Sequence, residues 1–265
     1  MNDAEEQRAA WNGHSGKVWV ESQKLLDQVL QPFEDAIFEA ELGPRVLDVG
    51  CGTGSATLRA ARSGTAVGVD ISAPMLARAR ERAEAVHLPA TFIEADAGTY
   101  EFAAESFDTI ISRFGVMFFE DPVKAFQNLR RAGKRLRAVA WRSAAENEFM
   151  TTAERAVGSM LPSLPPRRPN APGQFAFANH ERVIDVLRAS GWHDIDVAIL
   201  DVTCSMPATQ IIPYATRLGP VGRILQESDE ATRARVTEKL SAAFAHYIEG
   251  NEVRFPAAGW MITAS

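Results

Sequence analysis

Residues 46–54, which read VLDVGCGTG, decide the fold of this chain. The stretch begins with an apolar, β-branched run that is typical of a buried strand in a parallel sheet. It ends in glycines at alternate positions, and glycine allows a sharp turn close to a ligand where any side chain would collide. The stretch therefore predicts a strand, a ligand-binding loop and a helix that opens at about Ser55.

The spacing of the glycines separates this loop from two other nucleotide-binding loops. A dinucleotide loop needs GxGxxG, but the third position falls on Ser55 when the count starts at Gly50. A phosphate loop needs a lysine after its last glycine, and none follows here. Gly50, Gly52 and Gly54 form GxGxG instead, and Asp48 upstream would repel a pyrophosphate. The loop is predicted to bind a nucleotide-type cofactor that lacks a pyrophosphate.

The next apolar run, residues 65–69, ends in an acid that lies about 20 residues after Gly50, the distance expected of a ribose ligand. This acid, Asp70, would accept hydrogen bonds from the two ribose hydroxyls. Alternatively, Asp70 would cap the helix that begins near Ser72 and Pro74, although Ser72 is the better capping residue. Asp70 is therefore the predicted ribose ligand.

Two further strands, residues 91–95 and 107–111, end in polar residues, Asp96 and Ser112. Ligands of open α/β sheets lie beyond the carboxyl ends of the strands, so these residues and the turn at 112–114 should meet Asp48 and Asp70 in one crevice. An adenosine with an amino-acid tail would meet acids there at its ammonium, its ribose and its exocyclic amine.

Four segments in this order resemble the class I S-adenosylmethionine-dependent methyltransferases of the ubiquinone and menaquinone biosynthesis type, or methyltransferase type 11. They read VLDVGCGTG, VGVDIS followed by PML, FIEADA, and FDTIISRFGVMFFEDP. The resemblance is dense over residues 45–142, and AWRSAAEN, APGQFAFAN and VRFPAAGWMITAS resemble a bacterial branch whose substrates are mostly unassigned. It implies an α/β, Rossmann-like sheet of seven strands, mostly parallel with an antiparallel last strand. It also implies S-adenosyl-L-methionine as cofactor and S-adenosyl-L-homocysteine as product.

The resemblance implies a set of cofactor-binding residues: Trp19, Asp48, Gly50, Cys51, Gly52, Thr53, Gly54, Asp70, Ile71, Met75, Asp96, Ala97, Ser112 and Arg113. Asp48 and the glycine loop would hold the amino-acid end, with Trp19 packed near the methionine tail. Asp70 would take the ribose hydroxyls, while Ile71 and Met75 would lie against the adenine or its sugar.

At the third and fourth strands, Asp96 and Ala97 would meet the adenine edge, and Ser112 and Arg113 would line the floor beneath the sulfonium. One departure from the family follows the helix expected at residues 122–130. The family usually has a Pro-Gly-Gly turn there, whereas this chain has the basic segment RAGKR before a fifth strand at 136–141. These cations could bind nucleic acid, or they could stabilise a helix C-terminus, which the acidity of the whole chain favours.

Length and composition predict one methyltransferase domain over residues 1–265. It would comprise N-terminal lid helices at residues 1–42, the cofactor-binding core at residues 43–142, and the substrate cover with the C-terminal strands at residues 143–265. The net charge of -6 argues against a nucleic-acid partner, and no stretch approaches the roughly 20 apolar residues that cross a bilayer. Two cysteines are too few for a disulfide framework or a metal site, so a cytoplasmic location is expected. Nothing indicates the oligomeric state.

Segments outside the core are expected to enclose the methyl acceptor: residues 11–42, 146–179 and 207–250. Helices are expected at residues 181–190 and 229–247. Strands are expected at residues 194–200 and 253–263. Residues 161–172 are too proline-rich for a helix or a central strand and should form a stiff loop. Phe175 and Phe177 after this loop would line an acceptor pocket or contact the sulfonium, or would instead pin the loop to the core.

The acceptor is predicted to be a small apolar or aromatic molecule, because Phe114 and residues 116–119 flank the site; they could equally be core. The predicted substrate-binding residues are His14, Phe114, Phe175 and Phe177. His14 would act as a base toward the acceptor or would merely be exposed. No catalytic residue is identified, since displacement at a sulfonium needs mainly placement and desolvation.

Three functions stay open. The first is a small-molecule methyltransferase acting at oxygen, nitrogen or carbon. The second is an RNA or protein methyltransferase, although the chain has no Asn-Pro-Pro-Tyr or Asp-Pro-Pro-Tyr sequence of the kind typical of base-methylating enzymes. The third is a non-catalytic S-adenosylmethionine-binding protein, which a side-chain-filled acceptor crevice would favour.

Overall fold

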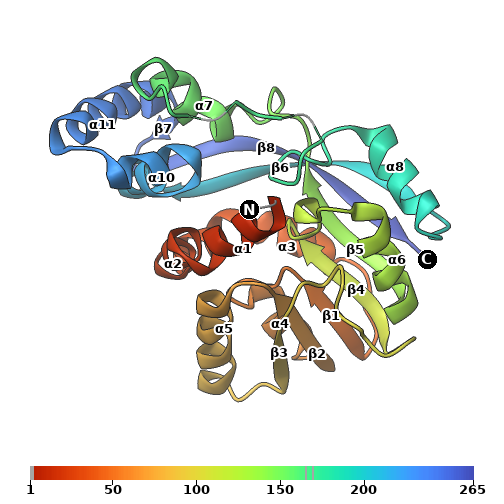
Figure 1. Ribbon diagram of the computed structural model, residues 1–265. Helices are drawn as coiled ribbons and strands as arrows, with labels where there is room; N and C mark the ends of the chain where they lie inside the picture. The colour runs from red at the N-terminus through yellow and green to blue at the C-terminus, as the bar shows by residue number, and fades with distance from the viewer. Residues whose placement is uncertain (1–2, 165, 169) are drawn as a thin grey trace.

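The computed structural model describes residues 3–164, 166–168 and 170–265 and is built on one sheet (Figure 1). Its strands are β1 (Arg45–Val49), β2 (Thr65–Asp70), β3 (Ala90–Glu94), β4 (Phe107–Arg113), β5 (Gly133–Trp141), β6 (Asp196–Pro207), β7 (Ile248–Glu249) and β8 (Glu252–Ala264). The order is β3-β2-β1-β4-β5-β8-β6, and β7 pairs with β8 alone. Strands β1 to β5 run parallel to one another, and β8 is antiparallel to both β5 and β6. The predicted Rossmann-like sheet is confirmed, with β7 as an unpredicted addition.

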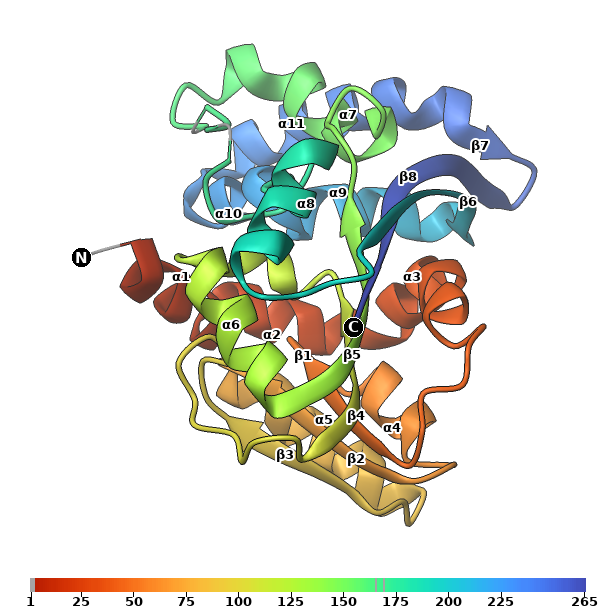
Figure 2. The same cartoon turned by 90° about the vertical axis from the view of Figure 1, so that its right-hand side faces the viewer.

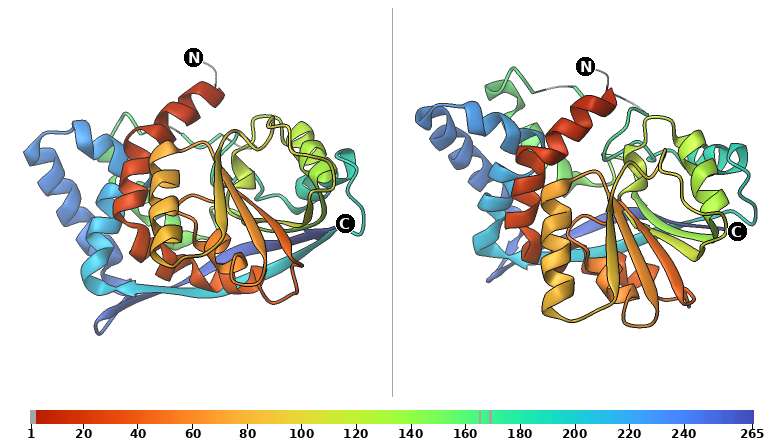
Figure 3. Two further views of the ribbon diagram at one scale, coloured as in Figure 1. Left: turned by 90° about the horizontal axis from the view of Figure 1, so that it is seen from below. Right: turned by 60° about the horizontal axis from the view of Figure 1, so that its bottom comes forward.

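Helices cover both faces of this sheet and one end of it. They are α1 (Asp3–Asn12), α2 (His14–Glu21), α3 (Gln23–Ile37), α4 (Ser55–Ala60), α5 (Ala73–Ala85), α6 (Pro122–Ala132), α7 (Glu148–Val157), α8 (His180–Ala189), α9 (Ile211–Arg217), α10 (Gly219–Glu227) and α11 (Glu230–Phe244). Figure 2 shows α3 and α4 on one side of the sheet and α6 and α8 on the other. Figure 3 shows α2 alongside α5. No described helix is long and apolar enough to cross a membrane.

The central strand β1 is apolar because it has a neighbour on each side and a helix on each face. Val46, Leu47 and Val49 are at most 2% exposed. Burial of such side chains stabilises a fold by about 1.5–3 kcal/mol each. The buried run ends at Val49, so the chain leaves the sheet at the glycine loop, directly at the carboxyl edge.

The last two long strands extend further than the sequence predicts. β6 was expected at residues 194–200 but continues to Pro207, which pairs with Glu252 of β8. In this outer part Cys204 and Met206 of β6 and Phe255 of β8 are almost fully buried, because α7, α9, α10 and α11 gather at that end of the ribbon (Figure 1). Tertiary burial, rather than local alternation of apolar residues, therefore sets the length of β6.

The segment between β6 and β7 contains three α-helices and two short 3-10 helices, Ala208–Gln210 and Ala245–Tyr247. The expected helix at 229–247 is α11, which ends at Phe244, and α9 and α10 precede it. Pro165 and Pro169 of the predicted stiff loop lie outside the described residues. The described part of residues 161–172 contains turns and neither helix nor strand.

Candidate cofactor and acceptor site

A cavity of about 790 Å³ lies at the carboxyl ends of the parallel strands. The loop after β1 contributes Gly50 and Gly52 to its lining. Asp70 and Arg113, the last residues of β2 and β4, and Ile71 after β2 line it as well. Asp96 and Ala97, which follow β3, also line this cavity. The strand ends that the sequence predicted to converge therefore meet in one place, as expected for a ligand site of an open α/β sheet.

The glycine loop is shaped by close backbone contact on one side and by open space on the other. Gly50 has a φ of +68°, and an added Cβ would lie 2.6 Å from Cα of Gly115. Gly52 has a φ of +54°, and the nearest atom to an added Cβ would be Sδ of Met75 at 3.7 Å. The loop is thus pressed against the turn after β4, while Gly52 presents bare backbone to the cavity.

Asp70 faces this loop from the end of β2. Its Oδ2 accepts a hydrogen bond from the backbone N–H of Gly52 at 2.8 Å, and its Oδ1 accepts one from Ser72 at 2.9 Å. Burial raises the pKa of Asp70, and these backbone donors oppose that rise. Ser72 occupies the N-cap position of α5, but its hydroxyl donates to the carbonyl of Trp11 at 2.7 Å rather than capping the helix.

Other residues predicted to bind cofactor lie behind the cavity wall instead of lining it: Asp48, Cys51, Thr53, Gly54 and Ser112. Asp48 is 1% exposed and accepts a 2.6 Å hydrogen bond from Oγ1 of Thr57. The pKa of Asp48 is raised to about 7, and burial of its side chain is the main cause. The hydroxyl of Ser112 donates to the carbonyl of Val49 at 2.8 Å and accepts from the N–H of Gly115 at 3.1 Å. Asp48 and Ser112 therefore support the loops from within.

Arg113 lines the cavity but is paired with an acid from α3. Its Nη1 lies 3.0 Å from Oε2 of Glu34, whose side chain is 4% exposed. A second acid, Asp27, lies 3.9 Å from Nη2 of Arg113. The guanidinium of this lining residue is therefore compensated by carboxylates of the same chain.

The N-terminal helices form a wall of the cavity and are fixed to the turn after β2. Asn12 donates to the carbonyl of Ile71 at 2.8 Å and accepts from the N–H of Ala73 at 2.9 Å. The next turns place His14 and Trp19 along the cavity. Nε2 of His14 is buried without a hydrogen-bond partner among the described residues.

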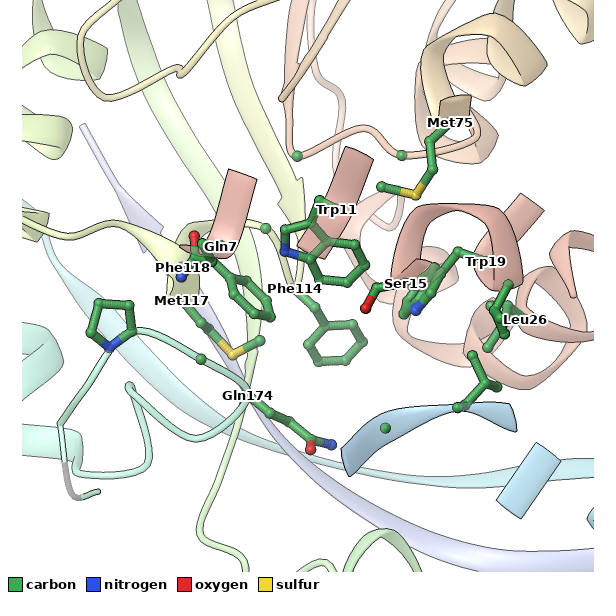
Figure 4. Close-up of a pocket in the computed structure, with 18 of the residues that line it drawn as sticks. Gln7, Trp11, Ser15, Trp19, Leu26, Met75, Phe114, Met117, Phe118 and Gln174 are labelled. Carbon is green, nitrogen blue, oxygen red and sulfur yellow. The ribbon is translucent and has the colours of Figure 1, made fainter. Parts of the chain in front are cut away.

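Trp11 also lines this wall and was absent from the predicted site residues. Its ring meets Trp19 edge to face at 5.8 Å and Phe118 at 5.7 Å (Figure 4). Trp11 belongs to the same WNGHSGKVWV segment as His14, and this position in the sequence could have indicated that it lines the site.

The other part of the cavity is lined by aromatic side chains around Phe114, and we call it the aromatic chamber. Phe114, a predicted acceptor contact, lines the cavity and stacks on Trp141 with ring centroids 4.0 Å apart. Figure 4 shows Phe114 and Met117 with Gln174 near them. Further lining residues come from α7, α9 and α11, and the sequence did not identify them: Phe149, Met150, Tyr214 and Phe244. The only feature of the sequence that could have indicated these residues was the amphipathic character of the helices that carry them.

The expectation that Phe175 and Phe177 line the acceptor pocket is wrong. Phe177 is 2% exposed and packs on Phe126 with ring centroids 5.9 Å apart. Phe175 lies under the guanidinium of Arg167 at 4.6 Å. Phe177 thus joins this segment to α6, and Phe175 packs partly buried against the core, which was the alternative interpretation; Gln174 lines the cavity instead.

Part of the chain is similar to known proteins. Residues 46–135 match a family model described as a methyltransferase domain. An uncharacterised protein of Mycobacterium tuberculosis is 33% identical over 153 residues, which cover 55% of this chain and 52% of that protein. A demethylmenaquinone methyltransferase of Thermus thermophilus is 41% identical over 90 residues, 33% of this chain and 41% of that enzyme. The chain spans about half the length of the first curated relatives it matches.

The fold has counterparts among solved structures. Magnesium protoporphyrin IX methyltransferase from Synechocystis, solved with bound S-adenosylhomocysteine, aligns with a TM-score of 0.56 at 18% identity and covers 77% of this chain and 94% of that one. This likeness concerns the fold, whereas the sequence match concerns the segment that builds the glycine loop and Asp70. Residues 46–135 therefore match a methyltransferase domain, and the chain has the Rossmann-like fold that is also found in this methyltransferase.

Proposed function

We propose that this protein is an S-adenosylmethionine-dependent methyltransferase that transfers a methyl group to a small apolar or aromatic metabolite by direct in-line displacement. One observation carries the proposal: a single cavity joins a glycine-and-acid end, built by Gly52 and Asp70, to an aromatic chamber around Phe114. The methyltransferase domain match covers the first end and supports this cofactor.

The residues present fit the cofactor. Bare backbone at Gly52 permits close approach of the methionine portion. A carboxylate offers about four acceptor positions, so Asp70 keeps capacity for ribose hydroxyls after bonding to Gly52 and Ser72. Ile71 and Met75 line the cavity and are proposed to enclose the adenosine, and Asp96 and Ala97, which also line it, are proposed to meet the adenine edge. Trp19 is proposed to cover the methionine portion.

The bound cofactor supplies an activated methyl group on a sulfonium. The chain supplies orientation and exclusion of water, which such a displacement chiefly requires. Phe114, stacked on Trp141, is proposed to form the floor on which the acceptor rests. His14 is proposed to contact the acceptor, because its buried Nε2 lacks a partner in the described part of the chain.

Two alternatives have less support. A non-catalytic binding protein would need an acceptor crevice filled by side chains, whereas this cavity continues past Phe114 to Phe149 and Tyr214. An RNA or protein methyltransferase would need a surface for a polymer, and the net charge of -6 disfavours RNA. A cytoplasmic location is part of the proposal, and it is supported by two cysteines that are buried and free.

The test is formation of S-adenosylhomocysteine. The purified chain is incubated with S-adenosylmethionine and a panel of small aromatic and apolar compounds that carry hydroxyl, amine or activated carbon positions. We expect product with at least one compound, and no increase when total cellular RNA is added. Cofactor binding without product across the whole panel would contradict the assignment, as would methylation of RNA alone.

A further inference from the structure

Two side chains in the aromatic chamber converge on one sulfur atom. Nε2 of Gln174 lies 3.5 Å from Sδ of Met150, and the hydroxyl of Tyr214 lies 3.8 Å from the same Sδ. The three residues come from α7, from the segment before α8, and from α9, and all three line the cavity. The cover therefore brings two hydrogen-bond donors to one point.

This arrangement leaves both donors poorly satisfied. A thioether is a weak acceptor, whereas a carboxamide and a phenol are strong donors. Over residues 3–164, 166–168 and 170–265, the contact with Met150 is the only side-chain hydrogen bond of either group. Burial raises the pKa of Tyr214 to about 12, so the phenol remains protonated and able to donate at neutral pH.

An aromatic ring lies beside these donors, and the acid of α7 that lines the cavity, Glu154, is paired. The ring of Phe149 lies 5.9 Å from that of Tyr214. Glu154 on the same helix lies 2.6 Å from Arg167, so its carboxylate is already compensated. An ammonium on the acceptor would therefore find no uncompensated carboxylate at Glu154, and burying an unpaired charge is unfavourable.

We propose that Gln174 and Tyr214 anchor the methyl acceptor by donating hydrogen bonds to an uncharged oxygen, a hydroxyl or a carbonyl, on an otherwise apolar ring system. This inference rests on the proposed function and specifies its substrate class. On binding, the acceptor oxygen replaces the sulfur of Met150 as the hydrogen-bond partner. A site built to bond an oxygen discriminates against an analogue that lacks it, because its partly buried donors then lose that hydrogen-bond partner.

The experiment is calorimetry on the full chain saturated with S-adenosylhomocysteine, whose own binding is measured first and tests the proposed function separately. The probes are 1-naphthol, naphthalene and 1-naphthoate. We expect 1-naphthol to bind at least about tenfold more tightly than naphthalene, and 1-naphthoate to bind no better than naphthalene. Equal binding of 1-naphthol and naphthalene, absence of binding by both, or tightest binding by 1-naphthoate would overturn the proposal.

Substitutions test whether Gln174 and Tyr214 cause the preference for 1-naphthol over naphthalene. Tyr214→Phe and Gln174→Leu should each weaken 1-naphthol about three- to tenfold and change naphthalene less than about twofold, and the double variant should bind both probes equally. Tyr247→Phe is the matched control, because Tyr247 also packs on Phe149, at 5.1 Å, but does not line the cavity. A preference for 1-naphthol that survives in the double variant, or that Tyr247→Phe also abolishes, would refute the anchor.

Discussion

The carboxylate of Asp70 accepts a hydrogen bond from the backbone N–H of Gly52 at 2.8 Å. The acid at the end of β2 is thereby held against the loop after β1, although the two residues belong to different strand ends. The bond sets the backbone of Gly52 and orients the carboxylate toward the cavity. The proposed ribose site and the proposed methionine site are therefore one connected unit.

Asp70→Asn should weaken binding of S-adenosylhomocysteine by about 10- to 100-fold, because hydrogen bonds to a charged group are worth about 1.5–3 kcal/mol. The measurement is isothermal calorimetry at one pH. Asp108→Asn is the control: Asp108 bonds Arg45 near the opposite end of β4 and does not line the cavity. Equal affinity of the Asp70 variant and the unchanged protein would contradict a ribose role.

Gly52→Ala should lose both stability and affinity. A φ of +54° strains any side chain, at a cost of about 1 kcal/mol, and the new methyl group would project into the cavity. Gly191→Ala separates the two effects, since Gly191 has a φ of +82° with nothing within 4 Å of an added Cβ. Urea unfolding should show comparable losses, while cofactor affinity should fall only for the Gly52 variant. A loss of affinity in both variants would instead indicate general destabilisation.

The buried Asp48 should make stability depend on pH. Its pKa is raised from 3.8 to about 7, so the folded chain holds this proton more tightly than the unfolded chain does. Its contribution to stability is therefore full at low pH and is lost as pH rises from 3.8 to about 7. Asp48→Asn should flatten that fall, as read from urea midpoints across the range. Asp70, whose pKa is also raised, should leave a residual slope.

Asp108→Asn serves as the reference for this pH series. The pKa of Asp108 is lowered by its hydrogen bond to Arg45, so its contribution has the opposite sign and is present above its unfolded pKa. If stability between about pH 4 and 7 declines as steeply in the Asp48→Asn variant as in the unchanged protein, Asp48 is ruled out as the source of that decline.

Asn12→Ala should accelerate release of S-adenosylhomocysteine and weaken its binding about three- to tenfold, because two hydrogen bonds fix α1 and α2 to the turn after β2. Stopped-flow fluorescence can follow release, since Trp11 and Trp19 line the cavity. Asn179→Ala is matched in chemistry: Asn179 caps α8 at 2.9 Å from the N–H of Arg182 and does not line the cavity. Identical release rates for both variants would argue against a retaining role for the N-terminal helices.

The sequence predicted the strands and the glycine loop of the proposed cofactor half, and local physical requirements explain why. Residues 46–54 and Asp70 are fixed by local requirements: buried apolar strands, left-handed turns and an acid at a strand end. The acceptor half depends on how distant segments pack together. Gln174 lies in the loop before α8, and Tyr214 lies in α9. The two side chains meet at Met150 because both of these segments fold over α7, and the spacing of residues in the sequence does not predict this contact.

The two clearest misses have the same origin. Phe175 and Phe177 are aromatic and follow a proline-rich loop, which suggested a pocket, but their rings pack on Arg167 and Phe126 instead. Asp48 stands next to the glycine loop in sequence, yet its side chain points to Thr57 and away from the cavity. Proximity in the chain indicated the right region in both cases and the wrong direction for the side chain.

The central claim is that the cavity at Gly52 and Asp70 receives a methionine-derived nucleoside and no dinucleotide. Calorimetric titration of the purified chain with S-adenosylmethionine, S-adenosylhomocysteine and NAD tests it directly. We predict saturable one-to-one binding of the first two, weakened in Asp70→Asn, and no heat of binding with NAD. Binding of NAD together with indifference to both S-adenosyl compounds would contradict the account.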